Sequence, residues 1–339
     1  MNFKQIYVLV LVLVFKLSFG QEVLPVYSDY LSDNYYLLHP SMAGAANCTK
    51  LRITGRQQWF DQSQAPSLQT VSFNGRLNDR SGAGIILIND RNGYHAQRGL
   101  RLTYAHHLKF SRDEVDLNQL SFGLSTGFAQ SVIDETTFKQ FDPTIYGGIE
   151  QKASYFNIDI GTSYNYLDFY LHFTVKNLLA SERNLYTQKE ATNLRRFILN
   201  TGYTFGDSQT ITWEPSVMFQ TVSQTKESII DLNLKVYKSL NDGAAKVWGG
   251  VSYRRSLDGA EYYEGTTIGS LTGGTISSQK LQYITPILGL NYKNFMISYT
   301  YSQLIQQVNF DTAGFHQLTL GLNLFCKPER YHCNCPAVN

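Results

Sequence analysis

The sequence predicts an all-β protein, namely a transmembrane antiparallel β-barrel of about fourteen strands. Three observations lead to this fold class. Tyr and Phe number 23 and 20, whereas charged residues make up only 17% of the 339 residues, below the usual quarter. Short segments alternate between apolar and polar residues, as strands with one apolar face do. The connections between these segments are short at one end and long at the other, as in outer-membrane barrels.

Composition and charge exclude two other classes of protein. The formal net charge is +2, and the first twenty residues hold two lysines and no acid, so 27 basic residues face 27 acidic residues in the remainder. A neutral chain lacks the basic face that nucleic-acid binding needs. Mean hydropathy is −0.24, and past residue 20 no apolar run approaches the ~18 residues of a spanning helix. The sequence therefore does not predict a helical membrane protein.

Residues 1–20 read as a signal peptide. Lys4 supplies the positive start, and residues 6–15 form the short apolar core. Ser18 and Gly20 place small residues at the positions that a signal peptidase requires. An anchoring helix is the alternative, but about ten apolar residues are too few to cross a bilayer. We expect export and cleavage before Gln21.

The body of the chain is a series of period-two strands. In the last one, Leu318, Leu320, Leu322 and Leu324 alternate with polar or small residues. Fourteen such segments can be counted, and most have roughly the 9–11 residues of a tilted membrane strand. The predicted strands are 51–60, 67–76, 82–90, 98–109, 117–130, 154–164, 167–176, 196–206, 209–219, 228–238, 244–254, 280–292, 294–304 and 314–325.

The lengths of the connections predict the orientation of the barrel. Every connection after an even-numbered strand is short, whereas those after odd-numbered strands include the three longest, 131–153, 177–195 and 255–279. Outer-membrane barrels have short periplasmic turns and long surface loops. An even strand count then places both chain termini on the periplasmic side. A soluble sandwich has no reason to sort its loops in this way, and its edge strands would need protection.

Charged side chains within the strands fall mostly on the polar face. A lipid-facing Arg or Lys near the bilayer midplane costs roughly 2–4 kcal/mol, so we expect these residues to face the lumen. They allow a selective pore, but mixed charges in any polar lumen are the more economical interpretation. The residues are Arg52, Arg56, Arg101, Asp159, His172, Lys176, Glu214, Asp231 and Lys235.

The segment before the barrel has a different character. Residues 21–50 are polar and are broken by Pro25, Pro40 and Gly44, so they do not predict a membrane strand. Their tyrosines are suited either to plug the lumen or to dock a periplasmic partner, and a leader that only caps the barrel floor is an equal alternative. The predicted organisation is a signal peptide (1–20), a periplasmic N-terminal segment (21–50), an outer-membrane barrel (51–325) and a periplasmic tail (326–339).

Four cysteines flank the barrel, namely Cys48, Cys326, Cys333 and Cys335. An even number in an exported protein suggests disulfides. Cys48 precedes the first strand and Cys326 follows the last. These two strands pair where the barrel closes, so we expect Cys48 to bond to Cys326 or to the nearby tail. A zinc site built from Cys326, His332, Cys333 and Cys335 is the rival, but it lacks a CxxC knuckle.

Enzyme motifs are weak. Residues 123–127 match G-x-S-x-G around Ser125, but a nucleophile elbow needs a strand, a sharp turn and a helix, whereas this match lies inside an alternating strand. His106 and His107 point to opposite faces of a strand and cannot chelate one metal. We expect no catalytic residue, no metal and no cofactor.

The N-terminal block carries one specific resemblance. Residues 25–30 read P-V-Y-S-D-Y, residues 36–44 read Y-L-L-H-P-S-M-A-G, and residues 56–59 read R-Q-Q-W before an Ala-Pro at 65–66. This block resembles the PorP/SprF family of outer-membrane proteins, which opens with P-x-[FY]-S-x-Y, Y-x-x-N-P-A-x-A-G and R-x-Q-W. His39 stands where the family has Asn, and Ser41-Met42 replaces Ala-Tyr. The export signal and the strands extend the resemblance over essentially the whole chain.

The resemblance implies a role without chemistry. Such proteins are associated with the type IX secretion system and gliding motility, and they export or anchor large surface adhesins that carry a type B C-terminal domain. The implied partners are such an adhesin, the secretion machinery or its periplasmic peptidoglycan-associated components, and outer-membrane lipid. The three long loops or the lumen would form the docking site. Residues of the N-terminal block are the implied partner contacts, namely Pro25, Tyr27, Tyr30, Tyr36, Pro40, Gly44, Arg56 and Trp59.

Two alternatives remain beside the anchor. One is an outer-membrane porin or FadL-like transporter of small solutes, in which the same barrel conducts. The other is a barrel enzyme that uses Ser125. The N-terminal block favours the anchor over the porin, because a plain porin needs no ordered periplasmic extension.

Overall fold

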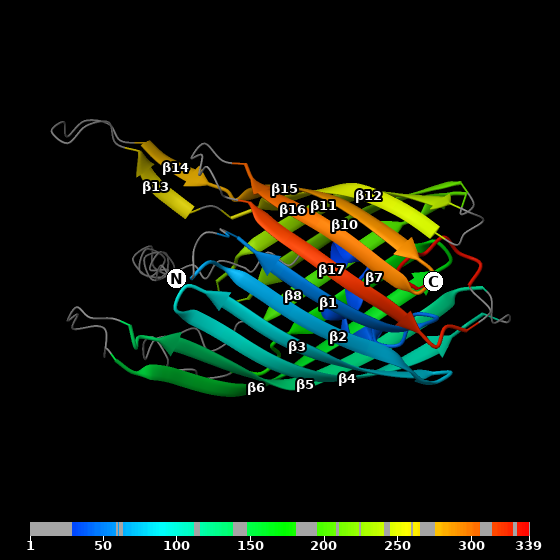
Figure 1. The fold of residues 1–339 in the computed structure, drawn as a ribbon, viewed down its shortest axis with the longest axis horizontal. Coiled ribbons are helices and arrows are strands. Elements are labelled where there is room, and N and C mark those ends of the chain that lie inside the picture. The colour runs from blue at the N-terminus through cyan, green and yellow to red at the C-terminus, as the bar shows by residue number, and fades with distance from the viewer. Residues whose placement is uncertain are drawn as a thin grey trace, which may run out of the picture.

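The chain forms a closed antiparallel β-barrel of fourteen strands (Figure 1). The computed structural model describes residues 29–58, 60, 64–111, 116–137, 148–180, 195–207, 210–223, 225–240, 245–258, 260–264, 275–305, 314–327 and 331–338. The barrel strands are β1 (Thr49–Gln57), β2 (Ser67–Asn78), β3 (Ser81–Asn92), β4 (His95–Lys109), β5 (Asn118–Asp134), β6 (Glu150–Tyr166), β7 (Phe169–Lys176), β8 (Arg196–Tyr203), β10 (Ile211–Val222), β11 (Ser228–Leu240), β12 (Ala245–Ser256), β15 (Gln282–Tyr292), β16 (Phe295–Leu304) and β17 (Phe315–Leu324).

The barrel closes between its first and last strands. Each strand pairs with its neighbours along the chain, and β1 pairs with β17 from Thr49 opposite Leu324 to Gln57 opposite His316. Closure leaves the main sheet without an open edge, which is how a β-structure satisfies its backbone groups in lipid. The predicted fold class is confirmed, and the fourteen predicted strands correspond one to one with those of the barrel.

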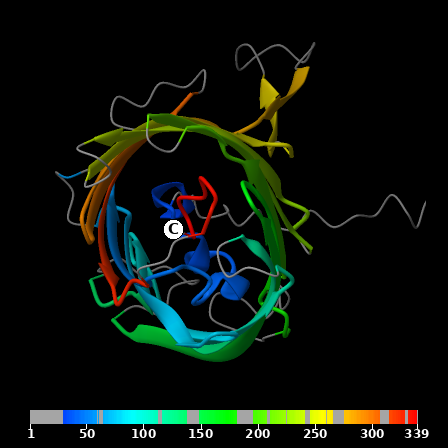
Figure 2. The same cartoon turned by 90° about the vertical axis from the view of Figure 1, so that its right-hand side faces the viewer.

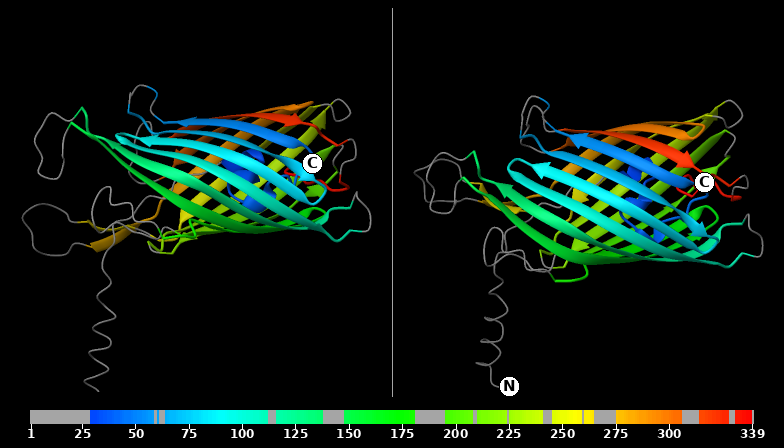
Figure 3. Two further views of the ribbon diagram at one scale, coloured as in Figure 1. Left: turned by 90° about the horizontal axis from the view of Figure 1, so that it is seen from below. Right: turned by 60° about the horizontal axis from the view of Figure 1, so that its bottom comes forward.

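The two ends of the barrel differ. We call the end that holds the β2–β3, β4–β5, β6–β7, β8–β10, β11–β12 and β15–β16 connections the turn end, and the opposite end the loop end. The β15–β16 connection is only Lys293 and Asn294. At the loop end a separate hairpin, β13 (Ala260–Glu264) and β14 (Thr275–Gln279), stands away from the barrel wall (Figures 1 and 3).

The strands bury polar side chains and expose apolar ones, which is the reverse of a soluble protein. Along β1, Arg52 and Thr54 are buried while Ile53 is exposed. Along β11, Asp231 is fully buried while its neighbour Leu232 is 47% exposed. An apolar outer surface and a polar interior are the arrangement that a bilayer selects.

Several predicted boundaries differ from the structure by up to three residues, and two regions differ by more. The β5–β6 ladder continues to Asp134 opposite Glu150, four residues on each strand past the predicted ends at 130 and 154. The predicted loop 255–279 contains the β13–β14 hairpin. At the end of β5, residues 131–133 are all buried, so the alternation on which the prediction depends stops before the strand does. The β13–β14 hairpin is a separate two-stranded sheet outside the barrel ladder.

Three short 3₁₀ helices precede β1, namely η1 (Asp29–Ser32), η2 (Tyr35–Leu37) and η3 (Pro40–Met42). Figure 2 looks into the barrel from the turn end and shows these segments inside the ring of strands, together with part of the C-terminal tail. Among the described residues, no helix is long and apolar enough to cross a membrane.

Candidate functional site: a plugged barrel lumen

Residues 30–47, which we call the plug, lie inside the barrel, and every one of them is buried. The sequence dictates irregular structure here. Pro40 starts η3, a position where its missing N–H costs nothing. Asp33 and Gly44 have positive φ angles of 58° and 67°, which break any regular helix or strand.

An ion-pair cluster joins the plug to the wall at Lys235, a residue of β11. Its ammonium group lies 2.6 Å from Asp33 of the plug and 3.1 Å from Glu214 of β10. All three side chains are at least 95% buried. Buried charges of this kind persist only when they are paired, so Asp33 and Lys235 each depend on the plug being in place.

Tyrosine hydroxyls complete this cluster. Tyr35 of the plug donates to Glu214 at 3.0 Å, and the wall residues Tyr170 and Tyr237 donate to the same carboxylate at 2.8 and 2.7 Å. Burial and the nearby Glu214 raise the pKa of Tyr35 well above its usual value, so its hydroxyl stays protonated and serves as a donor. We call Asp33, Tyr35, Glu214, Lys235 and their tyrosine partners the central cluster.

A second polar contact lies nearer the loop end. The Tyr30 hydroxyl donates to the Asp231 carboxylate at 2.6 Å, and Arg254 donates to both oxygens of that carboxylate at 2.7 and 2.6 Å. The two-pronged Arg–carboxylate pair fixes the acceptor geometrically. The first tyrosine of the plug is thereby held against β11 and β12.

A histidine pair lies next to the central cluster, where the His172 ring is 5.5 Å from that of Tyr35. His39 Nδ1 lies 2.9 Å from the hydroxyl of Thr174, and its ring centroid lies 5.1 Å from that of His172 on β7. Burial, with smaller contributions from His172 and Lys176, lowers the pKa of His39 well below its usual value. His39 is therefore neutral in the plugged barrel.

Glycines on the wall make room for the plug. Gly123 and Gly161 are paired across β5 and β6, and a Cβ on Gly123 would collide with the backbone of Pro40 and Ser41. A Cβ on Gly82 would collide with the backbone of Ala43 in the same way. Glycine inside a strand often marks the close approach of another backbone, and here that backbone is the plug.

The C-terminal tail, residues 326–338, closes the turn end. Cys48 is bonded to Cys326 and Cys333 to Cys335, and the first bond ties the start of β1 to the end of β17. Arg76 of β2 donates to the carbonyls of Gly44 and Ala45 and to the hydroxyl of Tyr331. One wall residue therefore holds both the plug and the tail.

The structure separates the residues that the N-terminal block singled out. Tyr30, Tyr36, Pro40 and Gly44 lie buried in the plug. Arg56 lies on the lumen face of β1, with its guanidinium 5.2 Å from the Phe315 ring. Pro25, Tyr27 and Trp59 lie outside the described residues, as do residues 1–20 and most of the three long loops.

The charged strand residues occupy the lumen. Seven of the nine are at least 91% buried, namely Arg52, Arg56, Asp159, His172, Glu214, Asp231 and Lys235. Arg101 pairs with Asp159 across β4 and β6, and Lys176 donates to the carbonyl of Leu37 in the plug at 2.8 Å. Most of these charges are therefore engaged with one another or with the plug, whereas Arg52 donates to backbone and side-chain groups of the wall.

The residues of the weak enzyme and metal motifs make contacts that hold the barrel, the plug and the tail together. Ser125 lies in the middle of β5 and bonds to Thr103 on β4, without the strand–turn–helix of a nucleophile elbow. His107 is buried between Ser121 and the Ala43 carbonyl. Cys326, Cys333 and Cys335 are all disulfide-bonded, and the described residues hold no group of three metal-ligating side chains.

The sequence identified only some of the residues that hold the plug. It placed His172, Lys176, Glu214, Asp231 and Lys235 on the lumen face, but not the others. Asp33, Tyr170, Tyr237 and Arg254 gave no signal of their own, because each is one polar residue among many on an alternating strand or in a polar leader. The glycines did carry a signal: Gly123 and Gly161 fall on the polar faces of adjacent strands, where a second backbone can approach.

Comparisons with known proteins address the fold and the family. Solved structures with similar folds include a Pseudomonas aeruginosa FadL homologue (10% identity, 86% of this chain and 94% of that one, TM-score 0.49). They also include a TodX monoaromatic hydrocarbon channel mutant (10%, 85% and 92%, TM-score 0.46) and the translocator domain of the autotransporter NalP from Neisseria meningitidis (12%, 82% and 88%, TM-score 0.36). A search of curated proteins found no significant match.

A family model matches nearly the entire barrel. This family is described as the type IX secretion system membrane protein PorP/SprF, and the match covers residues 20–322. The match spans the plug and thirteen complete strands, and it ends within the last one. With its outer-membrane barrel fold, the chain belongs to the PorP/SprF family of type IX secretion membrane proteins.

Proposed function

We propose that this protein is a closed outer-membrane anchor that exports or retains a large adhesin with a type B C-terminal domain at the cell surface, for adhesion or gliding. The observation that carries the proposal is the plug. Eighteen consecutive residues, 30–47, are buried in the lumen of a type IX secretion family barrel. A barrel filled in this way is suited to hold a partner on its surface rather than to conduct a solute.

The membrane orientation is part of this proposal. Residues 1–20 act as a cleaved signal peptide, and the turn end with the tail faces the periplasm, as short turns do in outer-membrane barrels. The loop end then faces outward, where Tyr-, Gly-, Ser- and Thr-rich loops suit adaptable contacts. Periplasmic components of the secretion machinery would meet the turn end.

Partner contact belongs to the exposed ends in this proposal. A partner reaches Tyr30, Tyr36, Pro40 or Gly44 only after the plug has left the lumen, because these residues are buried against the wall. We therefore assign these four residues first to plug retention. Pro25, Tyr27 and Trp59 remain proposed partner contacts, and Arg56, which is buried on the lumen face of β1, would contact a partner only inside the lumen.

The test is a pull-down of the tagged protein from its own cells in mild detergent, read by mass spectrometry. Recovery of a very large secreted protein through its C-terminal domain supports the proposal and names the partner. A variant in which a short turn replaces residues 260–279 should lose that partner while its barrel still migrates as a folded species in unheated gels. Recovery of the barrel without a partner, together with ion conduction in planar bilayers, would contradict the anchor function and favour a porin.

A further inference from the structure

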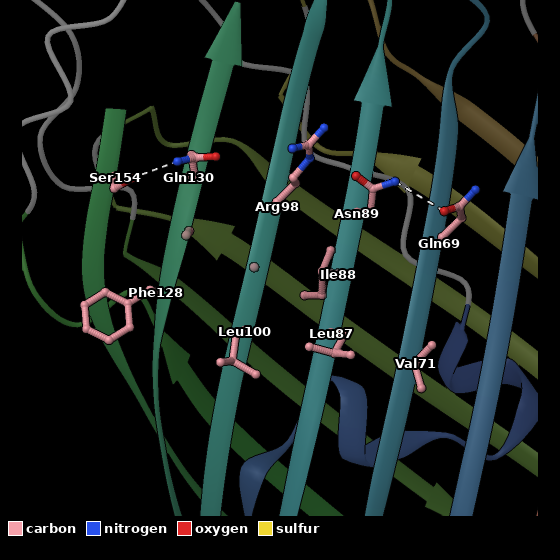
Figure 4. Close-up of a pocket in the computed structure, with 12 residues that line it drawn as sticks. Gln69, Val71, Leu87, Ile88, Asn89, Arg98, Leu100, Phe128, Gln130 and Ser154 are labelled. Atoms are coloured by element: carbon pink, nitrogen blue, oxygen red, sulfur yellow. Dashed lines mark hydrogen bonds between the residues drawn. The ribbon is translucent and has the colours of Figure 1, made fainter. Parts of the chain in front are cut away.

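The outer wall of the barrel carries an open groove near the loop end, with a volume of about 900 Å³ (Figure 4). It spans five strands from β2 to β6. Apart from Ile88, which packs toward the buried core that includes the plug, the side chains used below point outward, and the plug lies behind the strands in this view. The groove is thus separate from the plugged lumen and from the partner contacts proposed above.

Two straight rows of side chains build the groove. In the lower row, Val71, Leu87, Leu100 and Phe128 stand opposite one another on successive strands. In the upper row, one step closer to the loop end, Gln69, Asn89, Arg98, Gln130 and Ser154 are paired in the same register. The outer surface therefore changes from apolar to polar along a single line across five strands.

The upper row marks the edge of the membrane. On β4 the outward side chains from Leu100 to Leu108 include exposed Leu102 and Tyr104. Ten residues separate Arg98 from Leu108, which at ~3.4 Å per residue and a tilt of about 40° spans about 26 Å along the barrel axis. Outer-membrane barrels have an apolar band about 25 Å tall. Arg98 consequently lies at the depth of the lipid headgroups on the loop side.

Arg98 is the charged residue of the upper row, and no acidic residue of that row balances it. It is exposed, and within the described residues it makes no hydrogen bond or ion pair. The side chains on either side of it are paired elsewhere: the Asn89 amide donates to the Gln69 amide at 3.2 Å, and the Gln130 amide donates to the Ser154 hydroxyl at 3.3 Å. An unpaired guanidinium between amide groups matches a phosphate, which it can bind through two parallel hydrogen bonds.

We propose that this groove binds an anionic lipid of the loop-side leaflet, with its phosphate headgroup on Arg98. The acyl chain lies along the lower row, against Leu87, Leu100 and Phe128. Amides and the Ser154 hydroxyl offer further donors to the headgroup oxygens. A zwitterionic headgroup carries a quaternary ammonium beside its phosphate, which repels the guanidinium, so we expect the site to prefer lipids with a net negative charge.

The experiment titrates the purified full-length protein in neutral detergent with phosphatidylglycerol and reads bound lipid by native mass spectrometry. Phosphatidylcholine with the same acyl chains is the neutral comparison. We expect phosphatidylglycerol to be preferred, and Arg98→Gln to weaken its binding about tenfold, since a charge-assisted hydrogen bond is lost. Inorganic phosphate at millimolar concentration should not displace the lipid, because it lacks the acyl contact.

The matched control is Lys238→Gln, which removes an outward, exposed cation at the turn end of β11. It should leave the binding of phosphatidylglycerol to the loop-side groove unchanged. Equal loss in both variants would show non-specific attraction by surface charge and overturn the proposal. Wild-type binding by the Arg98 variant, or equal binding of the two lipids by the native protein, would overturn it as well.

Discussion

Replacing Lys235 with Met should release the plug from the wall. The ammonium group of Lys235 lies 2.6 Å from Asp33 and 3.1 Å from Glu214, and it is 1% exposed. Methionine matches the length of the side chain but leaves two buried carboxylates without a countercharge. Removing one partner of a buried pair costs about 3–5 kcal/mol. At ~1.4 kcal/mol per tenfold change, the released population should rise by a factor of roughly 10² to 4 × 10³.

The assay measures how often the plug opens. Ser32 is fully buried and bonds to Ser298 of β16, so a Ser32→Cys background places a reporter thiol in the plug. The rate of its maleimide labelling in the folded barrel follows the open population when closing is fast. Lys235→Met should accelerate this labelling by the factor above, within the limit set by the fully exposed thiol.

A second change separates lost pairing from general damage. Adding Glu214→Gln and Asp33→Asn to Lys235→Met removes the orphaned charges, so labelling should slow again toward the rate of the parent. The Lys235→Met variant could instead be labelled at the parent rate while its barrel stays intact in unheated gels. That result would refute the role of the central cluster in retaining the plug.

Further predictions concern the socket, the seam and pH. Gly123→Val should expel η3 and expose the plug to added protease, because a Cβ at position 123 collides with the Pro40 backbone. Gly55→Val is the control and should not expose the plug, because the space around position 55 is open. Replacing both Cys48 and Cys326 with Ser should destabilise the barrel by about 2–4 kcal/mol, seen as a lower unfolding temperature in gel-shift assays that no longer responds to reductant. His39 in the docked plug has a lowered pKa and cannot take up a proton, whereas His39 in the released plug accepts one near pH 6.5. The free energy that retains the plug should therefore be constant above that pH and decrease below it. The decrease is at most about 1.4 kcal/mol per pH unit. His39→Asn should flatten that part of the profile in the thiol-labelling assay, and an unchanged profile would contradict the role given to His39.

The barrel was predictable because its pattern is local and repeated. Alternation in segments such as 314–325 reports which face meets lipid, and the cost of a misplaced charge in lipid is large enough to keep that pattern clean. The loop asymmetry then predicts which end of the barrel faces the periplasm without any long-range information. The pairing of β1 with β17 follows from closure, and it brings Cys48 next to Cys326.

The contacts of the plug were not predictable from the same pattern. Asp33 meets Lys235 across 202 positions in the sequence, and neither residue differs locally from other polar residues. The strand pattern says that Glu214 and Lys235 face inward, but it does not say what fills the space before them. The proline, glycine and tyrosine content of the leader allowed a plug, a docking segment or a cap, and only the three-dimensional path distinguishes them.

The most direct test of the closed anchor is the conductance of the purified full-length protein in planar bilayers, compared with a variant lacking residues 30–46. We predict that the native protein stays closed at low voltage, while the shortened variant, whose Cys48 and strands are intact, opens a stable pore. A steady ohmic conductance of the native protein, equal to that of the shortened variant, would contradict the closed anchor and establish a conducting barrel.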